Sequence, residues 1–180
     1  MKASRKPKQE MNYCHRCGTK LTQQGLPHVF VCEKKHVVYA NASPTAALLL
    51  LNDKHEVLIM ARGKAPAIGA LTVPGGFCNG PESVEDCLVR EVAEETQLDR
   101  SQLGELHYVM SGVETYDTGD GELAPVSAVV FTSRITGPVE IQLDEENLWA
   151  KWVPLAKVQL TKFYSPVIVD ALRILQKRYQ

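Results

Sequence analysis

The sequence predicts an α/β fold, a mixed β-sheet sandwiched by two helices and preceded by a small metal-binding ribbon. Three observations lead to this prediction. Apolar runs of strand length alternate with turn residues and with one carboxylate-rich helical segment. Residues 162–179 carry apolar side chains at helical spacing, which is typical of a closing amphipathic helix. Cysteines and a histidine near the N-terminus are spaced like zinc ligands.

We expect three segments along the chain. Residues 1–11 are polar, carry four lysine or arginine side chains and lack an apolar run. We therefore expect a disordered tail there, and neither a secretory signal nor a membrane span. Residues 12–39 would form the ribbon and residues 43–180 the main domain, joined through the turn residues at 39–44.

The ribbon is predicted from Cys14, Cys17, Cys32 and His36, whose pattern is Cys-x2-Cys-x14-Cys-x3-His. Three thiolates and one imidazole at these intervals suit a closed tetrahedral site for a structural Zn²⁺ ion. Gly18 permits the tight turn that follows Cys17. We expect a cytoplasmic protein, and a cytosolic chain keeps its thiols reduced and available to a metal.

The fourth zinc ligand is left open by the sequence. His28 and His15 compete with His36 for this position. A simpler alternative is that the thiols are small buried side chains of an N-terminal hairpin, or that only three ligands remain. Cys78 and Cys87 lie outside the cluster, and we read Cys87 as a small core residue.

Strands of the main domain are predicted where apolar or β-branched residues form short runs. A hairpin turn is expected at residues 52–54, between the first two of them. The predicted strands are residues 45–51, 56–61, 71–73, 107–114, 126–133 and 151–153.

The helical segment that follows residue 83 carries the most informative side chains. Glu91, Glu94 and Glu95 are related by i, i+3 and i+4, so their carboxylates converge on one side of a helix. Like charges this close repel one another, and a hard cation such as Mg²⁺ or Mn²⁺ removes the repulsion. A metal held there would activate water and screen a pyrophosphate group. The sequence therefore predicts a catalytic Mg²⁺ or Mn²⁺ site.

A glycine-containing segment, residues 73–83, precedes this helix, and we read it as a loop with room for a phosphate. Gly75 and Gly76 let the backbone approach a bound group closely. Glu82 and Arg90 can form an ion pair that orients the loop against the helix. The alternative interpretation is a solvated acidic helix surface. That alternative explains neither the two glycines nor the spacing of the ion pair.

Together these residues resemble the signature of the Nudix hydrolase family, Gly-x5-Glu-x7-Arg-Glu-apolar-x-Glu-Glu-x-Gly-apolar. The signature runs here from Gly76 to Leu98 and departs from the family at Gln97, where the family has glycine. That glycine would end the helix in a left-handed conformation, and a side chain there costs about 1 kcal/mol. The departure leaves every carboxylate in place. The resemblance covers about residues 43–180 and implies a Nudix α/β/α sandwich.

The resemblance also implies roles for these residues. Glu91 and Glu95 would be the principal metal ligands, with Glu94 as a further ligand and the Gly75 carbonyl facing the metal. Glu91 or a later carboxylate would take the proton from water. Arg90 and Glu82 complete the expected catalytic set, and Gly75 and Gly76 the phosphate-binding set. Many family members supply one more carboxylate downstream, and the candidates here are Asp144, Glu145, Glu146 and Glu114, among which the sequence does not choose.

The ribbon is similar to the zinc ribbon that precedes a subset of Nudix hydrolases related to NADH pyrophosphatase. Their second ligand pair is usually Cys-x2-Cys, whereas Lys35 here cannot bind zinc and His36 follows it. The implied function is metal-dependent hydrolysis of the pyrophosphate bond in a nucleoside diphosphate derivative such as ADP-ribose, NADH or FAD. The proline-rich aromatic signature of NADH-specific relatives is absent between Leu98 and Ala124, which disfavours NADH.

Composition limits the partners of the chain. With 180 residues, 44% hydrophobic residues and a formal net charge of −1, it can bury a core and has no overall bias toward nucleic acid, which we do not expect as a partner. No apolar run is long enough for a bilayer, so we expect no membrane. A small-molecule nucleotide is the expected substrate, and the ribbon could support a homodimer. The alternatives are a nucleotide-sensing module without catalysis and an RNA- or protein-binding module that uses the ribbon as its contact surface.

Overall fold

The computed structural model describes residues 12–117 and 123–179, which fall into two compact units. One unit comprises Met1–Ala42 and Thr115–Pro125, and the other comprises Ser43–Glu114 and Val126–Gln180. The tail expected at residues 1–11 lies outside the described residues. The expected boundaries of ribbon and main domain stay a prediction, because the first unit also takes in a segment from the middle of the chain.

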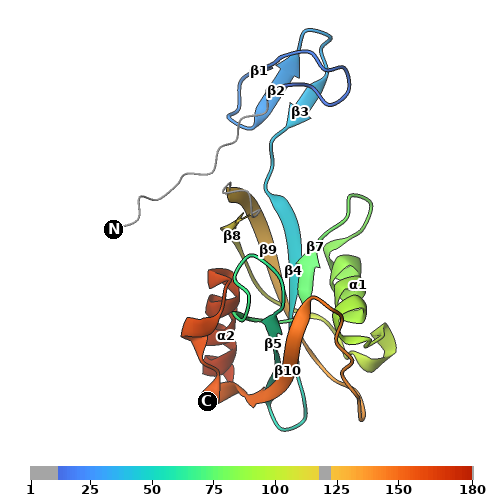
Figure 1. Ribbon diagram of the computed structural model, residues 1–180, viewed down its shortest axis with the longest axis vertical. Coiled ribbons are helices and arrows are strands. Elements are labelled where there is room, and N and C mark those ends of the chain that lie inside the picture. The colour runs from blue at the N-terminus through green and yellow to red at the C-terminus, as the bar shows by residue number, and fades with distance from the viewer. Residues whose placement is uncertain (1–11, 118–122, 180) are drawn as a thin grey trace. The chain divides into compact units, whose positions relative to one another are not determined.

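The elements follow one another as labelled in Figure 1. The strands of the small sheet are β1 (Leu21–Gln23), β2 (Val29–Cys32) and β3 (Val37–Tyr39). The strands of the large sheet are β4 (Ser43–Leu51), β5 (Glu56–Arg62), β6 (Leu71–Thr72), β7 (Gly75–Phe77), β8 (His107–Asp117), β9 (Leu123–Arg134) and β10 (Asn147–Pro154). The helices are α1 (Val84–Thr96) and α2 (Pro166–Arg178), with 3-10 turns η1 (Arg100–Gln102), η2 (Leu155–Lys157) and η3 (Leu160–Lys162).

The ribbon is a three-stranded antiparallel sheet in the order β1-β2-β3. Alternate side chains point to opposite faces of such short strands, so one face is buried and the other is exposed. Its buried core is small and includes two of the cysteines: Cys14, Leu21, Phe30, Cys32, Val38 and Ala40. A core of this size supplies little hydrophobic stabilisation, so the ribbon depends on a further cross-link.

The large sheet is mixed, as predicted from the sequence. Its strand order is β10-β5-β4-β9-β8, with β6 paired to β5 and β7 paired to β4. The central pair β4 and β9 is parallel from Ser43 opposite Val126 to Leu51 opposite Arg134, while β10 pairs with β5 in antiparallel fashion. A parallel pair needs a long connection, and here that connection contains β5, β6, β7, α1 and β8.

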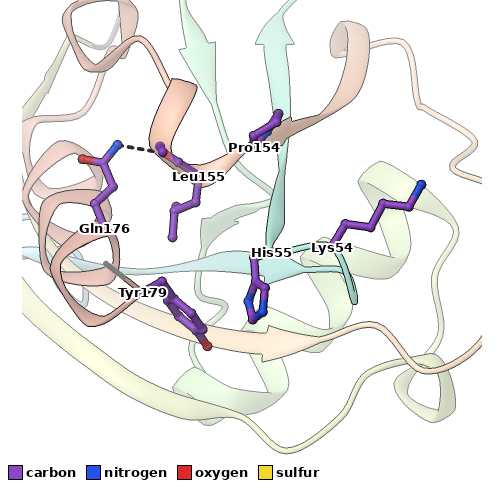
Figure 2. Close-up of a pocket in the computed structure, with 7 residues that line it drawn as sticks. Lys54, His55, Pro154, Leu155, Gln176 and Tyr179 are labelled. Carbon is purple, nitrogen blue, oxygen red and sulfur yellow. Dashed lines mark hydrogen bonds between the residues drawn. The ribbon is translucent and has the colours of Figure 1, made fainter.

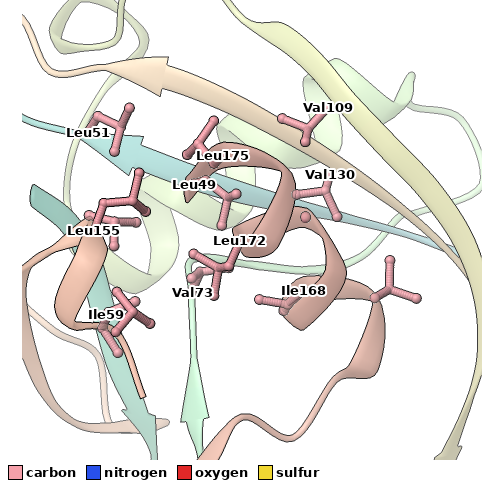
Figure 3. Packing of buried hydrophobic residues seen from close by; sticks show 14 of the residues in the cluster. Leu49, Leu51, Ile59, Val73, Val109, Val130, Leu155, Ile168, Leu172 and Leu175 are labelled. Carbon is pink, nitrogen blue, oxygen red and sulfur yellow. The ribbon is translucent and has the colours of Figure 1, made fainter. Parts of the chain in front are cut away.

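Two helices cover the two faces of this sheet, which confirms the predicted sandwich (Figure 1). The alternation of β4 divides its buried leucines between them. Leu49 and Leu51 pack in the cluster that contains α2, and Leu48 and Leu50 pack in the cluster that contains α1. Figure 3 shows the first cluster, in which Leu172 and other α2 side chains point toward the strands. Both faces are therefore closed by apolar packing.

Helix α1 begins and ends at identifiable caps. The Ser83 hydroxyl accepts a hydrogen bond from the Asp86 amide at 3.0 Å, which satisfies one free donor of the first turn. At the other end Gln97 has φ 57° and ψ 20°, and its amide donates to the Ala93 carbonyl at 2.9 Å. Gln97 thus adopts the left-handed conformation that the family's glycine was expected to adopt.

Several boundaries differ from the sequence prediction. Gly75–Phe77 forms strand β7, although the two glycines indicated a loop, because this backbone hydrogen-bonds along β4. The closing helix begins at Pro166 rather than at residue 162, since proline suits a first helical turn and Ser165 caps it. Strands β8, β9 and β10 are longer than predicted. None of the helices in the described part of the chain is long and apolar enough to cross a membrane.

Candidate metal and substrate site

The two glycines of β7 bring its backbone against both a neighbouring strand and helix α1. Gly75 has φ +145°, and a Cβ added there would collide with the carbonyl oxygen of Ala46 on β4. A Cβ added at Gly76 would collide with the carboxylate of Glu91. Glycine is therefore required at Gly75, where the clash is with backbone, whereas at Gly76 a side chain would displace the Glu91 carboxylate. The result is that a carboxylate of α1 lies directly against the β7 backbone.

Glu95 is held by β7 and by the start of β10. Its Oε2 accepts a hydrogen bond from the Gly75 amide at 2.8 Å, and its Oε1 accepts from Asn147 Nδ2 at 3.4 Å. Burial raises the pKa of Glu95 to about 7, although these two hydrogen bonds act in the opposite direction. Among the described residues Glu95 takes part in no ion pair. Glu95 is therefore a carboxylate that either a proton or a cation would compensate.

Glu91 and Glu94 complete the carboxylate cluster on the same side of α1. The Glu91 side chain is 16% exposed, and burial raises its pKa despite the neighbouring Arg90 guanidinium. Glu94 is more open, with 57% of its side chain exposed. Exposure therefore increases from the partly buried carboxylate of Glu95 to the solvated carboxylate of Glu94, which suits a cation that keeps several waters.

Arg90 ties the helix to the segment that precedes it. Its Nε and Nη2 donate to the two oxygens of Glu82 at 3.1 and 2.7 Å, which is the ion pair that the sequence predicted. The same guanidinium donates to Glu91 at 2.8 Å, to Glu94 at 2.9 Å and to the Phe77 carbonyl at 3.0 Å. It lowers the pKa of Glu82 to about 2. Arg90 therefore orients two carboxylates of the cluster and anchors the end of β7.

The four downstream candidates for a further carboxylate lie in different surroundings. Asp144 Oδ1 accepts from Asn147 Nδ2 at 3.0 Å, so Asn147 links Asp144 to Glu95. Glu146 forms an ion pair with Lys64, and its charge raises the pKa of Glu91. Asp144 and Glu146 thus lie near the carboxylate cluster.

Glu145 and Glu114 are placed otherwise. Glu145 is exposed to solvent. Glu114 accepts hydrogen bonds from the Ser165 hydroxyl at 2.9 and 2.7 Å and from the Val167 amide at 3.4 Å, at the start of α2. Negative charge is favourable at that helix end, so Glu114 serves the packing of α2.

Asn147 is the residue of this region that sequence reasoning missed. Its amide bridges two carboxylates, and its backbone opens β10 beside Arg62 of β5. The available signal was its position directly after the acidic run at residues 144–146, at the start of a strand. An amide there neutralises no charge, so charge patterning alone could not identify it.

The ribbon gathers the four predicted zinc ligands. The ligand atoms of Cys14, Cys17, Cys32 and His36 lie within 4.8 Å of one another. Cys14 Sγ is 3.6 Å from His36 Nδ1, and Cys17 Sγ is 3.7 Å from Cys32 Sγ. Two thiolates that bind one tetrahedral zinc ion at about 2.3 Å lie about 3.8 Å apart, so the donors fit this metal. His36 is the histidine of this cluster, rather than the competitors His15 and His28.

Two tight turns position these ligands. After the first cysteine pair, the Gly18 amide donates to the Cys14 carbonyl at 2.8 Å, with Gly18 at φ +69°. In the second turn the Lys35 amide donates to the Cys32 carbonyl at 2.8 Å, and Lys35 has φ 63°. The Thr19 hydroxyl, 3.1 Å from Cys17 Sγ, is the main cause that lowers the pKa of Cys17 to about 6. A thiolate available near neutral pH favours metal binding.

One cavity of about 330 Å³ lies apart from both clusters. It is lined by the β4–β5 turn, by η2 and by the end of α2, as Figure 2 shows. His55 and Tyr179 face one another there with ring centroids 5.0 Å apart. No residue of the carboxylate cluster lines it. This cavity is therefore separate from the carboxylate cluster.

Comparison with protein families and curated proteins identifies the domain. The profile of the NUDIX domain matches residues 42–170. The NAD-capped RNA hydrolase NudC of Pseudomonas fluorescens (strain Pf0-1) is 31% identical over 91 residues, which are 50% of this chain and 32% of that protein. NudC of Pseudomonas aeruginosa (strain LESB58) is 30% identical over 92 residues, again 32% of its length. The match thus spans about a third of the length of these curated relatives.

Solved structures share the fold at lower identity. A NUDIX hydrolase from Nitrosomonas europaea has a TM-score of 0.67 at 18% identity and covers 94% of this chain and 93% of its own. An Ap4A hydrolase from C. elegans, in a binary complex, has a TM-score of 0.63 at 21% identity over 77% of this chain and 98% of its own. The NUDIX domain of Shewanella oneidensis NrtR, complexed with ADP ribose, has 0.60 at 22% identity, over 78% and 90%. At these identities the likeness shows the fold alone.

Proposed function

Because this chain belongs to the Nudix family, we propose that it hydrolyses the pyrophosphate bond of a nucleoside diphosphate derivative with the help of Mg²⁺ or Mn²⁺. The observation that carries this proposal is Glu95, a partly buried carboxylate without a cationic partner among the described residues that accepts a hydrogen bond from the Gly75 amide. A buried carboxylate is stable only when a proton or a cation compensates it. Glu91 and Glu94 bring two further carboxylates to the same side.

The residues around this cluster have distinct roles in the proposed reaction. Glu91, Glu94 and Glu95 hold the metal, which when bound lowers the pKa of water and screens the charge of the diphosphate. The oxygen of a water molecule bonds to one phosphorus, and the anhydride P–O bond breaks, which releases a nucleoside monophosphate and a phosphorylated second product. The proton of the water goes to a carboxylate, for which Glu91, Asp144 and Glu146 are the candidates. Arg90 and Glu82 position the carboxylates and do not touch the substrate.

For the substrate we propose a nucleotide in which a second group is joined through the diphosphate. ADP-ribose and FAD fit this class, and so do dinucleotides. Supporting names among the relatives are an NAD-capped RNA hydrolase, an Ap4A hydrolase and a domain complexed with ADP ribose, all of which concern nucleotides with phosphoanhydride linkages. For the ribbon we propose a structural Zn²⁺ held by Cys14, Cys17, Cys32 and His36, supported by the fit of these donors to a tetrahedral ion.

The test compares Glu95→Gln with the wild type on ADP-ribose, NADH, FAD and a dinucleoside polyphosphate, with Mg²⁺ or Mn²⁺ present. We expect the amide to lower kcat by at least about 100-fold on any substrate that the wild type cleaves, because a metal ligand is lost. The matched control is Glu85→Gln, which removes an exposed carboxylate from the first turn of the same helix. If wild type and Glu95→Gln turn over every compound equally, or cleave none, the protein is a nucleotide-binding module.

A further inference from the structure

Charge is distributed unevenly along this chain. Residues 12–42 contain four lysine or arginine side chains and one acidic side chain, and therefore carry a formal charge of +3. Residues 43–180 contain twelve basic and nineteen acidic side chains and carry −7, but Asp117, Asp120 and Glu122 of this range belong to the unit of the ribbon. Counted by unit, the formal charges are +3 for the unit that contains the ribbon and −4 for the other. Three thiolates with one Zn²⁺ ion contribute −1, so the ribbon stays cationic when it holds its metal. The net charge of −1, from which we expected no nucleic-acid partner, hides this separation.

One face of the ribbon sheet is open. Its other face forms the small core, so the side chains that alternate with the core point outward. Cross-strand pairing places Thr22 opposite Val31 and Val31 opposite Val37, and an isolated bridge extends the row from Lys20 to Tyr13. Tyr39 follows on the same face of β3. We call this set the open face; it consists of Tyr13, Lys20, Thr22, Val29, Val31, Val37 and Tyr39.

The open face exposes aromatic rings at its two sides. Tyr13 is 68% exposed and Tyr39 is 61% exposed, with Val37 beside them at 44%. The His28 ring lies 6.5 Å from the Tyr39 ring. Exposed aromatic rings on a short sheet can serve as platforms on which unpaired bases stack, and they add little to the stability of the ribbon itself. This part of the ribbon therefore suits a planar, apolar partner.

The cationic side chains of the ribbon suit a partner that carries negative charge. Lys20 is part of the open face, and Arg16, Lys34 and Lys35 lie exposed in the two metal-binding turns. Glu33 is the one acidic side chain in residues 12–42. Phosphates of a strand whose bases stack on the tyrosines can thus meet several positive charges within one small unit.

We propose that the open face of the ribbon binds single-stranded nucleic acid, with Tyr13 and Tyr39 stacking on bases and Arg16, Lys20, Lys34 and Lys35 contacting phosphates. The strands of the ribbon are three or four residues long, and none of its described elements is a helix that could enter a duplex groove. Exposed rings stack only on bases that are not already stacked in a duplex. This activity is separate from the proposed hydrolysis, since it needs neither Glu95 nor its metal.

The experiment measures fluorescence anisotropy of labelled oligo(U) and oligo(dT) of about 12 nucleotides with the full chain, in buffer without Mg²⁺ or Mn²⁺. We expect binding to weaken about 20- to 50-fold between about 50 mM and about 200 mM salt, as three or four phosphate contacts predict. Tyr39→Ala and Tyr13→Ala should each weaken it about 5- to 100-fold. Tyr108→Ala, which removes an exposed tyrosine of the acidic unit, is the matched control and should leave it unchanged.

Zinc content is measured on every variant, so that loss of binding is compared only among proteins with an intact ribbon. The proposal is overturned if the wild type does not bind at the lower salt concentration. It is also overturned if Tyr39→Ala and Tyr108→Ala behave alike, or if a duplex of the same length binds as tightly and is unaffected by the tyrosine variants. Sedimentation of the protein without nucleic acid tests one further outcome. A dimer that dissociates in the Tyr39→Ala variant would assign the open face to a second copy of this chain and would overturn the proposal.

Discussion

The ribbon and the carboxylate cluster both gather donor groups that suit a metal, but a bound metal would have a different relation to folding in each. The ribbon has six buried core residues, two of which are cysteines of the zinc site. The carboxylate cluster stands on a helix and a strand that are fixed by two large apolar clusters. In the first case the ion replaces a core, and in the second it is added to a finished one. Removal of bound metal should therefore unfold the ribbon, whereas the other unit should keep its fold and lose only the proposed hydrolytic activity.

The largest expected effect that tests this contrast is loss of the zinc site. We expect His36→Ala and Cys32→Ser to lose the zinc equivalent and the protection of the β1–β3 amides, because zinc binding at such sites supplies about 10 kcal/mol or more. Metal analysis after gel filtration and hydrogen exchange measure the two losses. The other unit should keep its fold, since it buries its own core.

The controls for this prediction are the two histidines that competed for the fourth position. His15→Ala and His28→Ala should retain a full zinc equivalent, because neither side chain belongs to the cluster of ligand atoms. Retention of zinc by His36→Ala, with loss in His28→Ala, would contradict the assignment. Loss of the whole fold together with the zinc would break the contrast between the two units.

A second prediction concerns Arg90, which holds the carboxylate cluster together without metal. Arg90→Ala leaves Glu82 and Glu91 without their cation, and both side chains are less than a fifth exposed. We expect the free energy of unfolding to fall by about 3 kcal/mol. Urea unfolding followed by tryptophan fluorescence measures it, because Trp149 and Trp152 both lie in β10 and report on this unit.

The matched control is Arg173→Ala, which removes an exposed i,i+3 ion pair with Asp170 on α2. Such a surface pair contributes less than about 1 kcal/mol. Equal losses in the two variants would show that Arg90 has no more than a surface role. That result would contradict the inference that Arg90 holds the carboxylates in place before a metal binds.

A third prediction uses the pH dependence of Glu95. Its pKa in the folded protein, about 7, is above its ordinary value of 4.5, so its neutral form is favoured by folding. This contribution is fully present below pH 4.5 and is lost as the pH rises through about 7. Without divalent metal, the unit should be less stable at about pH 8 than at about pH 5.5, by about 2 kcal/mol.

Metal and substitution provide the two comparisons for this pH effect. Mg²⁺ or Mn²⁺ should restore stability at about pH 8, because the cation compensates the ionised carboxylate. Glu95→Gln should flatten the dependence, since an amide does not titrate. Glu82 has the opposite sign, and its contribution is lost only as the pH falls toward about 2, outside this window. A slope that Glu95→Gln leaves unchanged would assign the pH dependence to other groups.

The smallest expected effect lies at the end of α1. Gln97 holds the left-handed conformation with a side chain, and Gln97→Gly should stabilise the unit by about 1 kcal/mol in the same urea assay. The control is Gln159→Gly, an exposed glutamine at φ −85°, where glycine should be neutral or destabilising. Stabilisation by both variants would remove the conformational explanation.

The sequence predicted those parts of the molecule whose information is local. The helix that carries Glu91, Glu94 and Glu95 required only a helical pattern, and the strand at residues 45–51 required only a short run of apolar residues. Both predictions are confirmed as geometry in the structure. The pairing of Arg90 with Glu82 could also be predicted, because the same loop-to-helix segment contains both residues.

The features that sequence reasoning missed depend on distant parts of the chain. Gly75–Phe77 is a strand because β4 lies beside it, which two glycines could not indicate. Asn147 reaches Glu95 across 52 positions, and Glu114 caps α2 across 51 positions. Such contacts depend on the topology of the sheet, and no local pattern encodes them.

The parallel pairing of β4 with β9 has a consequence for synthesis on the ribosome. Thr132 of β9 donates to the Leu49 carbonyl of β4 across 83 positions, so β4 cannot complete its pairing until β9 has left the exit tunnel. The described strand pairs of the ribbon and its four donor atoms all lie within residues 12–42, so these parts can form and bind an ion much earlier. Between the emergence of β4 and that of β9, the nascent chain therefore presents a folded ribbon followed by a strand with exposed leucines. A holdase chaperone would bind the chain most readily during this interval.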